Sequence, residues 1–235
     1  LLKVYFCLLI TWFGEMYKKK SLFIVFEGIE GSGKSYLSKK LYKNLKRRGA
    51  SVILTREPGG TKRAEKIRKI ILNDYFLKKN KEKFHKYTDT LLYLAARNEH
   101  IENKIKPALL RNKTVICDRF VDSTFAYQVY GKGVNKKFID VIHKQILGRV
   151  KPNITFVLKA NINKALQRLK KRKTKNRYDK FSKGFYNKAQ KAFIRIAKKN
   201  RKNYYVLDNS ENNRKIIEKI LKIVEKKINA KINRR

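Results

Sequence analysis

The sequence predicts an α/β protein in which helices cover both faces of a five-stranded parallel sheet. Two observations support this fold class. Short apolar runs alternate with helical patterns after residue 21, and a glycine-rich phosphate-binding motif follows the first run. The chain of 235 residues, 42% of them hydrophobic, is long enough to bury one sizeable core. We therefore expect a three-layer α/β/α domain.

Five segments have the short, apolar character of buried strands: Leu22–Phe26, Val52–Thr55, Thr114–Cys117, Ile154–Leu158 and Tyr204–Leu207. Helical patterns separate them, at 35–47, 61–72, 87–110, 121–130, 135–147, 161–171 and 183–199. A last helix is predicted at about 211–228, where aliphatic residues fall on one broad face. Strands joined through helices are expected to lie parallel, and such sheets bind ligands beyond the carboxyl ends of their strands.

The phosphate-binding motif G-x-x-x-x-G-K-[ST] lies between the first predicted strand and the first predicted helix. Its residues are Gly28, Ile29, Glu30, Gly31, Ser32, Gly33, Lys34 and Ser35. Glycines let the backbone wrap a triphosphate with its N–H groups pointing inward. Lys34 can then reach the β- and γ-phosphates, and Ser35 can ligate Mg²⁺. A plain glycine-rich turn would not explain Lys34 and Ser35 together, so the motif predicts a nucleoside triphosphate site.

The formal net charge is +43, and polycations bind the phosphate backbones of nucleic acids. Lysine, asparagine and isoleucine are, however, abundant along the whole chain, as AT-rich codons would produce. The sequence has no arginine-rich block interleaved with aromatic residues and no helix-turn-helix signature. We therefore expect a diffuse cationic surface without a dedicated nucleic-acid partner. Cys7 and Cys117 lie far apart, with no disulfide or zinc spacing, which suits a reducing cytosol.

Three further motifs follow the phosphate loop. The segment TREPGGT at 55–61 comes directly after the second predicted strand, LLYLAARNEH at 91–100 lies in a predicted helix, and DRFVDSTFAYQ at 118–128 follows the third strand. Together the four motifs resemble those of thymidylate kinases, which phosphorylate dTMP to dTDP with ATP. The resemblance runs from about Leu22 to the last helix. It implies a P-loop kinase fold with a helical lid, and an ATP phosphate site formed by the loop residues and Tyr36.

The residues that would bind phosphate and metal lie at strand ends. Arg56 can pair bidentately with a phosphate, although a surface salt bridge with Glu57 is the alternative. The resemblance implies that Arg56 and Arg119 hold the phosphate of dTMP. It also implies that Asp118, together with Ser35, positions Mg²⁺ near the transferring phosphoryl group.

The residues that would bind the nucleoside come from the second and third of these motifs. Tyr93 and Arg97 are four residues apart and therefore share a helix face, although Tyr93 could be an ordinary core residue. The resemblance implies that Tyr93 stacks on thymine and that Arg97 contacts the monophosphate or the base edge. It implies that Ser123 and Gln128 hydrogen-bond the thymine ring. Glu30 would contact the sugar 3′-hydroxyl, the alternative being a solvated loop carboxylate.

The phosphate loop lacks a cation that some members of the family place there, because Gly31 occupies the position of that arginine. The bacterial-type branch supplies the cation from the lid instead. Arg172 and Arg177 are the expected donors, and Arg168 is a weaker candidate. We therefore expect Lys34, Asp118, Arg119 and these two lid arginines to be catalytic. Tyr178 resembles a lid residue that crowds the sugar 2′ position and favours deoxyribose.

Residues 21–235 are expected to form the kinase-like domain, with the lid at about 168–182. Residues 1–20 are expected to be an extension outside the fold. Within them, Leu1–Phe13 is apolar but too short for a convincing membrane span, and it lacks the basic start of a signal peptide. A membrane anchor is the less favoured alternative.

The expected protein is a cytoplasmic homodimer that binds dTMP and ATP, uses Mg²⁺ and has no membrane partner. Three alternatives remain at this point. The chain could phosphorylate a deoxynucleoside or another nucleoside monophosphate, since related folds share the phosphate loop. It could be a nucleotide-dependent regulatory protein with little turnover. Its charge alone could indicate a nucleic-acid-binding protein.

Overall fold

A computed structural model describes residues 21–73, 84–172, 176–210 and 215–232. Five parallel strands form one sheet in the order β2-β3-β1-β4-β5. They are β1 (Phe23–Gly28), β2 (Val52–Arg56), β3 (Thr114–Asp118), β4 (Ile154–Lys159) and β5 (Tyr204–Asp208). The five predicted strands are therefore confirmed, each ending one or two residues later than expected. The expected extension at residues 1–20 lies outside the described residues.

The α-helices are α2 (Lys34–Arg47), α3 (Lys62–Asn73), α4 (Lys86–His100), α5 (Lys106–Leu110), α6 (Val121–Thr124), α7 (Lys136–Leu147), α8 (Ile162–Lys170), α9 (Lys183–Lys199) and α10 (Ile216–Ile232). The predicted helix 87–110 is divided, because a π-helical turn, Ile101–Ile105, separates α4 from α5. Pro107 follows this turn and has no N–H to continue a regular ladder. A second π-helical turn, Phe125–Val129, follows α6. The predicted start of the last helix falls at 211–214, outside the described residues.

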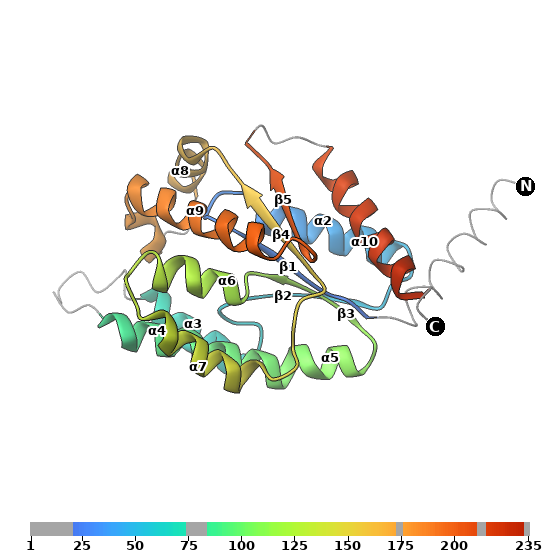
Figure 1. The fold of residues 1–235 in the computed structure, drawn as a ribbon, viewed down its shortest axis with the longest axis horizontal. Coiled ribbons are helices and arrows are strands. Elements are labelled where there is room, and N and C mark those ends of the chain that lie inside the picture. Colours follow the sequence, from blue (N-terminus) through green and yellow to red (C-terminus); the bar gives the residue numbers. More distant parts are fainter. Residues whose placement is uncertain (1–20, 74–83, 173–175, 211–214, 233–235) are drawn as a thin grey trace, which may run out of the picture.

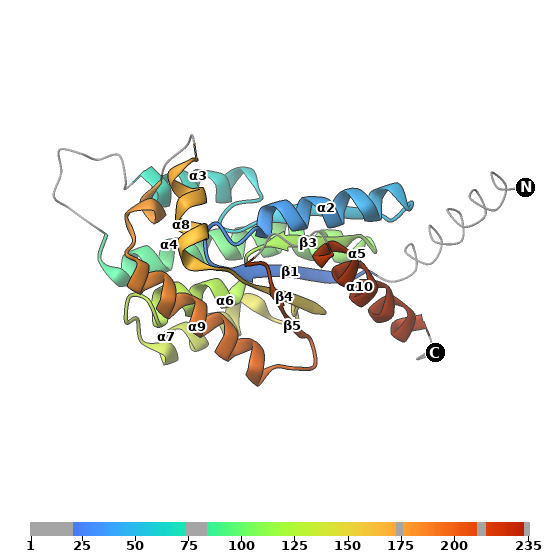
Figure 2. The ribbon, with the colours of Figure 1, turned by 90° about the horizontal axis from the view of Figure 1, so that it is seen from above.

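Helices cover both faces of the sheet, which confirms the three-layer architecture. Ile24 of β1 belongs to the core shared with α2 and α10, whereas its neighbour Val25 faces the core that includes α5. Val157 of β4 packs in a third cluster with α9. Figure 1 shows the order of the elements, and Figure 2 shows α2 and α9 on opposite sides of β1 and β4.

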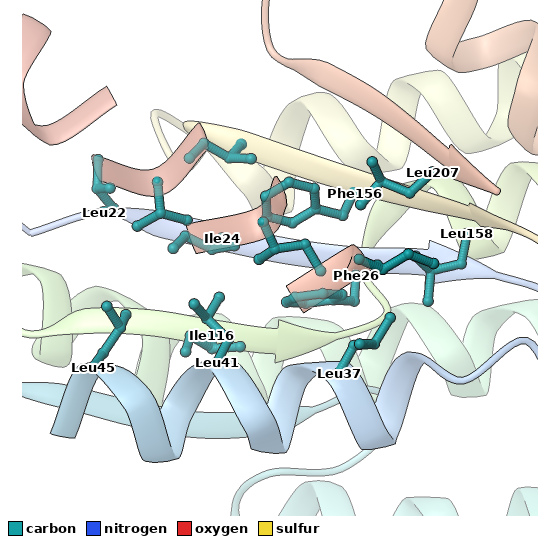
Figure 3. Packing of buried hydrophobic residues seen from close by; sticks show 14 of the residues in the cluster. Leu22, Ile24, Phe26, Leu37, Leu41, Leu45, Ile116, Phe156, Leu158 and Leu207 are labelled. Carbon is teal, nitrogen blue, oxygen red and sulfur yellow. The ribbon is translucent and has the colours of Figure 1, made fainter. Parts of the chain in front are cut away.

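The largest core cluster fixes α2 against β1. Leu37, Leu41 and Leu45 are spaced four residues apart, so they form one stripe of α2 that faces the sheet. The stripe meets Ile24 and Phe26 of β1, as Figure 3 shows. Because the phosphate loop joins β1 directly to α2, this packing holds both ends of the loop.

The strand register brings three sequence motifs to one edge of the sheet. Phe26 of β1 pairs with Asp118 of β3, and Asp118 pairs with Arg56 of β2. The phosphate loop, the segment at 55–61 and the segment at 118–128 therefore all leave the sheet at its carboxyl edge, where open α/β sheets bind ligands. None of the described helices is both long and apolar enough to cross a membrane.

Candidate active site

The phosphate loop is held in a wrapped conformation. Gly28, Gly31 and Gly33 all have positive φ angles, at 137°, 72° and 96°, which a residue with a side chain adopts only under strain. The ammonium group of Lys34 donates a hydrogen bond of 2.6 Å to the carbonyl of Ile29, inside the loop. Burial, together with the nearby positive charge of Arg119, lowers the pKa of Lys34 to about 8. The lysine is therefore mainly charged at neutral pH but loses its proton readily.

Helix α8 packs directly on this loop. A Cβ atom at Gly31 would lie 2.5 Å from the carbonyl oxygen of Ala165, so this arrangement leaves no room for an arginine at that position. Arg168 donates a hydrogen bond of 2.8 Å to the Gly31 carbonyl. On the other side, the amide of Asn209 donates to the Ser32 carbonyl at 2.8 Å. The loop is thus held between α8 and the end of β5.

A wide groove, here called the outer groove, opens beside the loop and α2. Lys34, Ser35 and Tyr36 line it together with Arg168, Asn209 and other residues. It continues into a second cavity, because Gly31, Lys34 and Ser35 line both spaces. Most of the predicted triphosphate-binding residues therefore border these two spaces, whereas Gly28, Ile29 and Ser32 line neither of them.

Ser35 and Asp118 meet at the carboxyl edge of the sheet. The hydroxyl of Ser35 hydrogen-bonds to Oδ2 of Asp118. Oδ1 of Asp118 is buried and has no hydrogen-bond partner among the described residues. A hydroxyl and a carboxylate with a spare oxygen are hard ligands that suit Mg²⁺, which usually takes few protein ligands and completes its shell with phosphate oxygens and water. The two residues therefore fit the metal role expected of them.

The second space, here called the cationic cavity, gathers positive side chains from separate elements. Its lining cations are Lys34, Arg56, Arg68, Arg119 and Arg172. Arg56 pairs with Glu65 of α3 at 3.1 Å, so the alternative of a salt bridge with Glu57 is wrong. This exposed pair leaves the guanidinium at the cavity wall, where it is able to bind a phosphate.

Arg68 of α3 is a cavity residue that sequence reasoning did not identify. It donates a hydrogen bond of 2.7 Å to the carbonyl of Pro58, which fixes its guanidinium beside Arg56. Burial and the charge of Arg56 lower its pKa. An amphipathic helix directly after the TREPGGT segment was the only available signal, and lysines and arginines on such helices are usually solvated.

Arg119 occupies a strained backbone position and binds two acceptors of the phosphate loop region. Its φ is 74°, which is unusual for a residue with a side chain. Its guanidinium donates to the Gly28 carbonyl at 3.0 Å and to Glu30 at 2.7 Å. Glu30 also accepts a hydrogen bond of 2.5 Å from Tyr127, so the alternative of a solvated loop carboxylate is wrong. Arg119 lines the cationic cavity beside Asp118.

A smaller space, here called the inner pocket, lies beyond Arg119. Tyr93, Arg97, Ser123, Gln128 and Tyr178 line it, so the structure brings together five of the residues expected to bind a thymine nucleoside. Glu30, the sixth, lines the cationic cavity instead. The hydroxyl groups of Tyr93 and Tyr178 contact each other across it. Gln128 and Ser123 are both buried, so their polar groups lie in the pocket wall shielded from bulk water.

Arg97 is bound by the protein on every side of its guanidinium. It donates to Glu57 and Thr124 at 2.7 Å and to the Phe120 carbonyl at 2.8 Å. Burial and the charge of Arg97 lower the pKa of His143 to about 3, so the His143 ring is neutral. Its Nε2 accepts the fourth hydrogen bond from Arg97 at 2.8 Å. Arg97 therefore joins the motifs behind the pocket, in addition to reaching the pocket itself.

Glu57 is the acceptor that organises this arrangement. Its carboxylate also contacts Nδ1 of His100 at 3.1 Å, and Nε2 of His100 lies 2.7 Å from the hydroxyl of Thr55. Burial opposes ionisation of Glu57, but Arg97 and His100 together lower its pKa. A Cβ at Gly60 would lie 2.5 Å from the His100 ring, which explains glycine there.

A buried pair of acids supports the segment after β3. Glu27 accepts hydrogen bonds from the backbone N–H of Phe120 at 2.8 Å and from the Ser123 hydroxyl at 2.6 Å. Burial raises the pKa of Glu27. Burial and the charge of Glu27 raise the pKa of Asp122 to about 7, and Tyr204 donates to Asp122 at 3.3 Å. The pair is adjacent to the site but outside its cavities.

The two lid arginines are placed differently. Arg172 lines the cationic cavity together with Lys34 and Asp118. Arg177 lines none of the three spaces formed by the described residues; it is buried and donates to Asp89 and to the Ile71 carbonyl. The structure therefore brings Arg172, but not Arg177, to the predicted site of phosphoryl transfer. Lid residues 173–175 lie outside the described part of the chain.

Comparisons with known proteins agree with this geometry. The family model for thymidylate kinase matches residues 26–220. A thymidylate kinase of Wolbachia pipientis (strain wPip) is 42% identical over 210 residues, which cover 88% of this chain and 97% of the relative. A thymidylate kinase of Bacillus pumilus is 34% identical over 206 residues, covering 87% and 95%. A crystal structure of thymidylate kinase from Ehrlichia chaffeensis matches with a TM-score of 0.69 at 34% identity, covering 88% of this chain and 99% of that one.

The buried acids predict a pH-dependent effect of Asp122→Asn. The pKa of Asp122 is about 7 in the folded chain and 3.8 when unperturbed. The folded state thus holds the proton more tightly, and its stability falls as pH rises from about 4 to 7. Asn removes this loss, so the free energy of unfolding should rise by on the order of 1–3 kcal/mol at pH 8 and change little at pH 4. Urea unfolding at both pH values measures it.

The matched control for this prediction is Asp208→Asn. A hydrogen bond from Lys159 and others from Ser210 lower the pKa of Asp208 to about 2, so this substitution should not stabilise the protein at pH 8. An equal effect of Asp122→Asn at both pH values would contradict the assignment of a protonated acid at that position.

Proposed function

The chain belongs to the thymidylate kinase family and phosphorylates dTMP to dTDP with ATP, a step of dTTP biosynthesis, and we propose how its residues carry out this reaction. The observation that carries the proposal is the continuity of the three spaces. The outer groove and the cationic cavity share Lys34 and Ser35, and the cavity and the inner pocket share Arg119 and Tyr178. Two nucleotides placed end to end along this line would meet at their phosphates.

We propose that dTMP binds in the inner pocket with its phosphate toward the cationic cavity. Tyr93 would stack on the thymine ring, and Ser123 and Gln128 would hydrogen-bond it. A buried site of this kind rejects analogues that leave its polar groups unpaired. Tyr178 lies at the junction of pocket and cavity, where the sugar would pass, and this supports its role against ribose.

The acceptor phosphate would be held by Arg56 and Arg119, with Arg68 as a third cation. Arg68 is included because its guanidinium is fixed beside Arg56 by the Pro58 carbonyl. An arginine binds a phosphate through two parallel hydrogen bonds, which fix the direction of the attacking oxygen. Glu30 holds Arg119 and would accept from the sugar 3′-hydroxyl, as expected for that position.

ATP would bind along the outer groove with its triphosphate wrapped by residues 28–35 and Lys34 on the β- and γ-phosphates. Ser35 and Asp118 would hold Mg²⁺, which neutralises developing charge on the transferring group. The acceptor needs little or no general base, since the second pKa of a phosphate monoester is about 6. The difficulty is charge repulsion between two polyanions, and the cations of the cavity offset it.

Arg172 is the lid cation that we assign to the transferring phosphoryl group. It lines the cavity that Lys34 and Asp118 also line, whereas Gly31 leaves the loop without an arginine. We also propose that the protein is cytoplasmic and acts as a homodimer, as the resemblance implies. Ile70 of α3 and Leu91 of α4 are exposed hydrophobic residues on two helices that pack together, and they are available to such an interface.

A panel of acceptors tests the substrate assignment. Purified protein with Mg-ATP should convert dTMP at a kcat/KM at least roughly 100-fold above dCMP, dAMP, GMP and thymidine, because each of these leaves either the polar groups of the base pocket or the arginines unpaired. The ratio to dUMP, which lacks only the 5-methyl group, should be smaller, roughly tenfold or more. Formation of ADP and of the diphosphate product measures it. Equal turnover of all acceptors, or none, would refute the assignment.

The lowered pKa of Lys34 predicts a pH profile. In the free enzyme, kcat/KM for ATP should fall as pH rises through about 8, because the deprotonated amine no longer attracts the triphosphate. Bound phosphates stabilise the charged form, so kcat should persist to higher pH than kcat/KM. Steady-state kinetics from pH 6 to 10 measures kcat and kcat/KM for ATP. If both fell at the same pH, this role of Lys34 would be contradicted.

Substitution of the lid cation tests its position. Arg172→Ala should lower kcat by roughly 100-fold or more while KM for dTMP changes little, since the charge acts on the transferring group. The matched control is Lys171→Ala, the exposed neighbour, for which kcat should stay within about twofold. Full turnover by Arg172→Ala would remove it from the mechanism.

A further inference from the structure

Arg177, although expected to face the phosphates, is bound behind the inner pocket. It comes from the short 3₁₀ turn Arg177–Lys180 that precedes α9, and only 9% of it is exposed. One of its terminal nitrogens donates to Oδ1 of Asp89 at 2.5 Å and to the Ile71 carbonyl at 3.0 Å. Ile71 lies in the last turn of α3, where carbonyl groups lack helical partners and favour a cation.

Asp89 is the centre of this arrangement. Its side chain lies on α4, is completely buried, and uses both oxygens. Oδ1 binds Arg177, and Oδ2 accepts a hydrogen bond of 2.6 Å from Lys132, which follows the second π-helical turn. A buried carboxylate requires such partners, because burying an unpaired charge is strongly unfavourable. Asp89 therefore ties three separate segments together.

The residue next to Arg177 forms part of the wall between the cavities. Tyr178 lines both the inner pocket and the cationic cavity, and its hydroxyl contacts that of Tyr93. Tyr93 is one helical turn after Asp89 on α4, and Tyr178 follows Arg177 directly. The ion pair and the tyrosine pair are therefore neighbouring contacts that both join α4 to the 3₁₀ turn. Tyr186 of α9 holds the Tyr178 carbonyl at 2.7 Å.

We propose that Asp89 and Arg177 are positioning residues that fasten the 3₁₀ turn to α4 and thereby set Tyr178 against the bound acceptor. Neither residue lines the outer groove, the cationic cavity or the inner pocket formed by the described residues. Their effect passes through Tyr178, which narrows the pocket around dTMP and excludes water from the transferring phosphoryl group. The inference rests on the proposed binding of dTMP in the inner pocket.

A double-mutant cycle tests the ion pair. Asp89→Asn and Arg177→Met should each raise KM for dTMP by roughly tenfold and increase the share of ATP that is hydrolysed without forming dTDP, with KM for ATP within about twofold of the unmodified value. The KM for dTMP of the double variant should be no higher than that of the more impaired single variant, because both substitutions break the same Asp89–Arg177 contact. The matched control, Asp140→Asn, breaks an exposed pair with Lys136 and should change neither quantity.

Different results would overturn the inference. If Arg177→Met lowered kcat by roughly 100-fold at unchanged KM for dTMP while Asp89→Asn behaved as the unmodified enzyme, Arg177 would act on the phosphates directly. Additive effects in the double variant would also refute the coupling. Turnover of dTMP by the unmodified enzyme is measured in the same assay, so failure of the substrate assignment is distinguishable from failure of the ion pair.

A further variant keeps the test decisive if Asp89→Asn does not fold, as judged by circular dichroism. Arg177→Lys retains a charge that can pair with Asp89, so KM for dTMP should stay within about threefold of the unmodified value while Arg177→Met raises it. Equal loss in the two Arg177 variants would refute an ion-pair role.

Discussion

The site depends on one electrostatic constraint. Several positively charged side chains must lie close together although they repel one another. Five cations line one cavity, and burial together with their mutual repulsion lowers the pKa of Lys34 and of Arg68. Carboxylates at the margin offset the repulsion: Glu65 pairs with Arg56, and Glu30 with Arg119. The cavity therefore stays positively charged while the carboxylates hold its arginines in position. Phosphate groups would take over part of this charge neutralisation when they bind.

The arginines near the site divide by what surrounds them. Arg97 and Arg177 are buried and bound to protein acceptors, so they join segments that are distant in the sequence. Arg119 is also held by protein acceptors, the Gly28 carbonyl and Glu30, but it lines the cationic cavity together with Arg172, where a ligand can reach both. The same residue type thus serves two purposes, because its planar fork of donors suits both a buried network and a bound phosphate.

Backbone geometry sets the distance between lid and loop. Helix α8 touches the loop so closely at Gly31 that a side chain there would collide with Ala165, and Arg168 binds the Gly31 carbonyl. Glycine at position 31 is therefore what allows α8 to pack this closely against the loop. It leaves the neighbouring lid residue Arg172 on the cavity wall.

The amino-acid sequence by itself determined the strands, the layer architecture and the phosphate loop, because these follow from local periodicity and from a motif whose residues are adjacent. It also predicted that Arg56, Arg119 and Asp118 lie near one another, because each stands at or directly after a strand end that parallel pairing brings to one edge. Only the tertiary structure decided the roles available to Arg68 and Arg177. Each is one cation in a lysine- and arginine-rich stretch, and what distinguishes it is a partner from a distant segment: Pro58 for Arg68, and Asp89, 88 residues earlier, for Arg177. Such partners are set by packing, which no local pattern encodes.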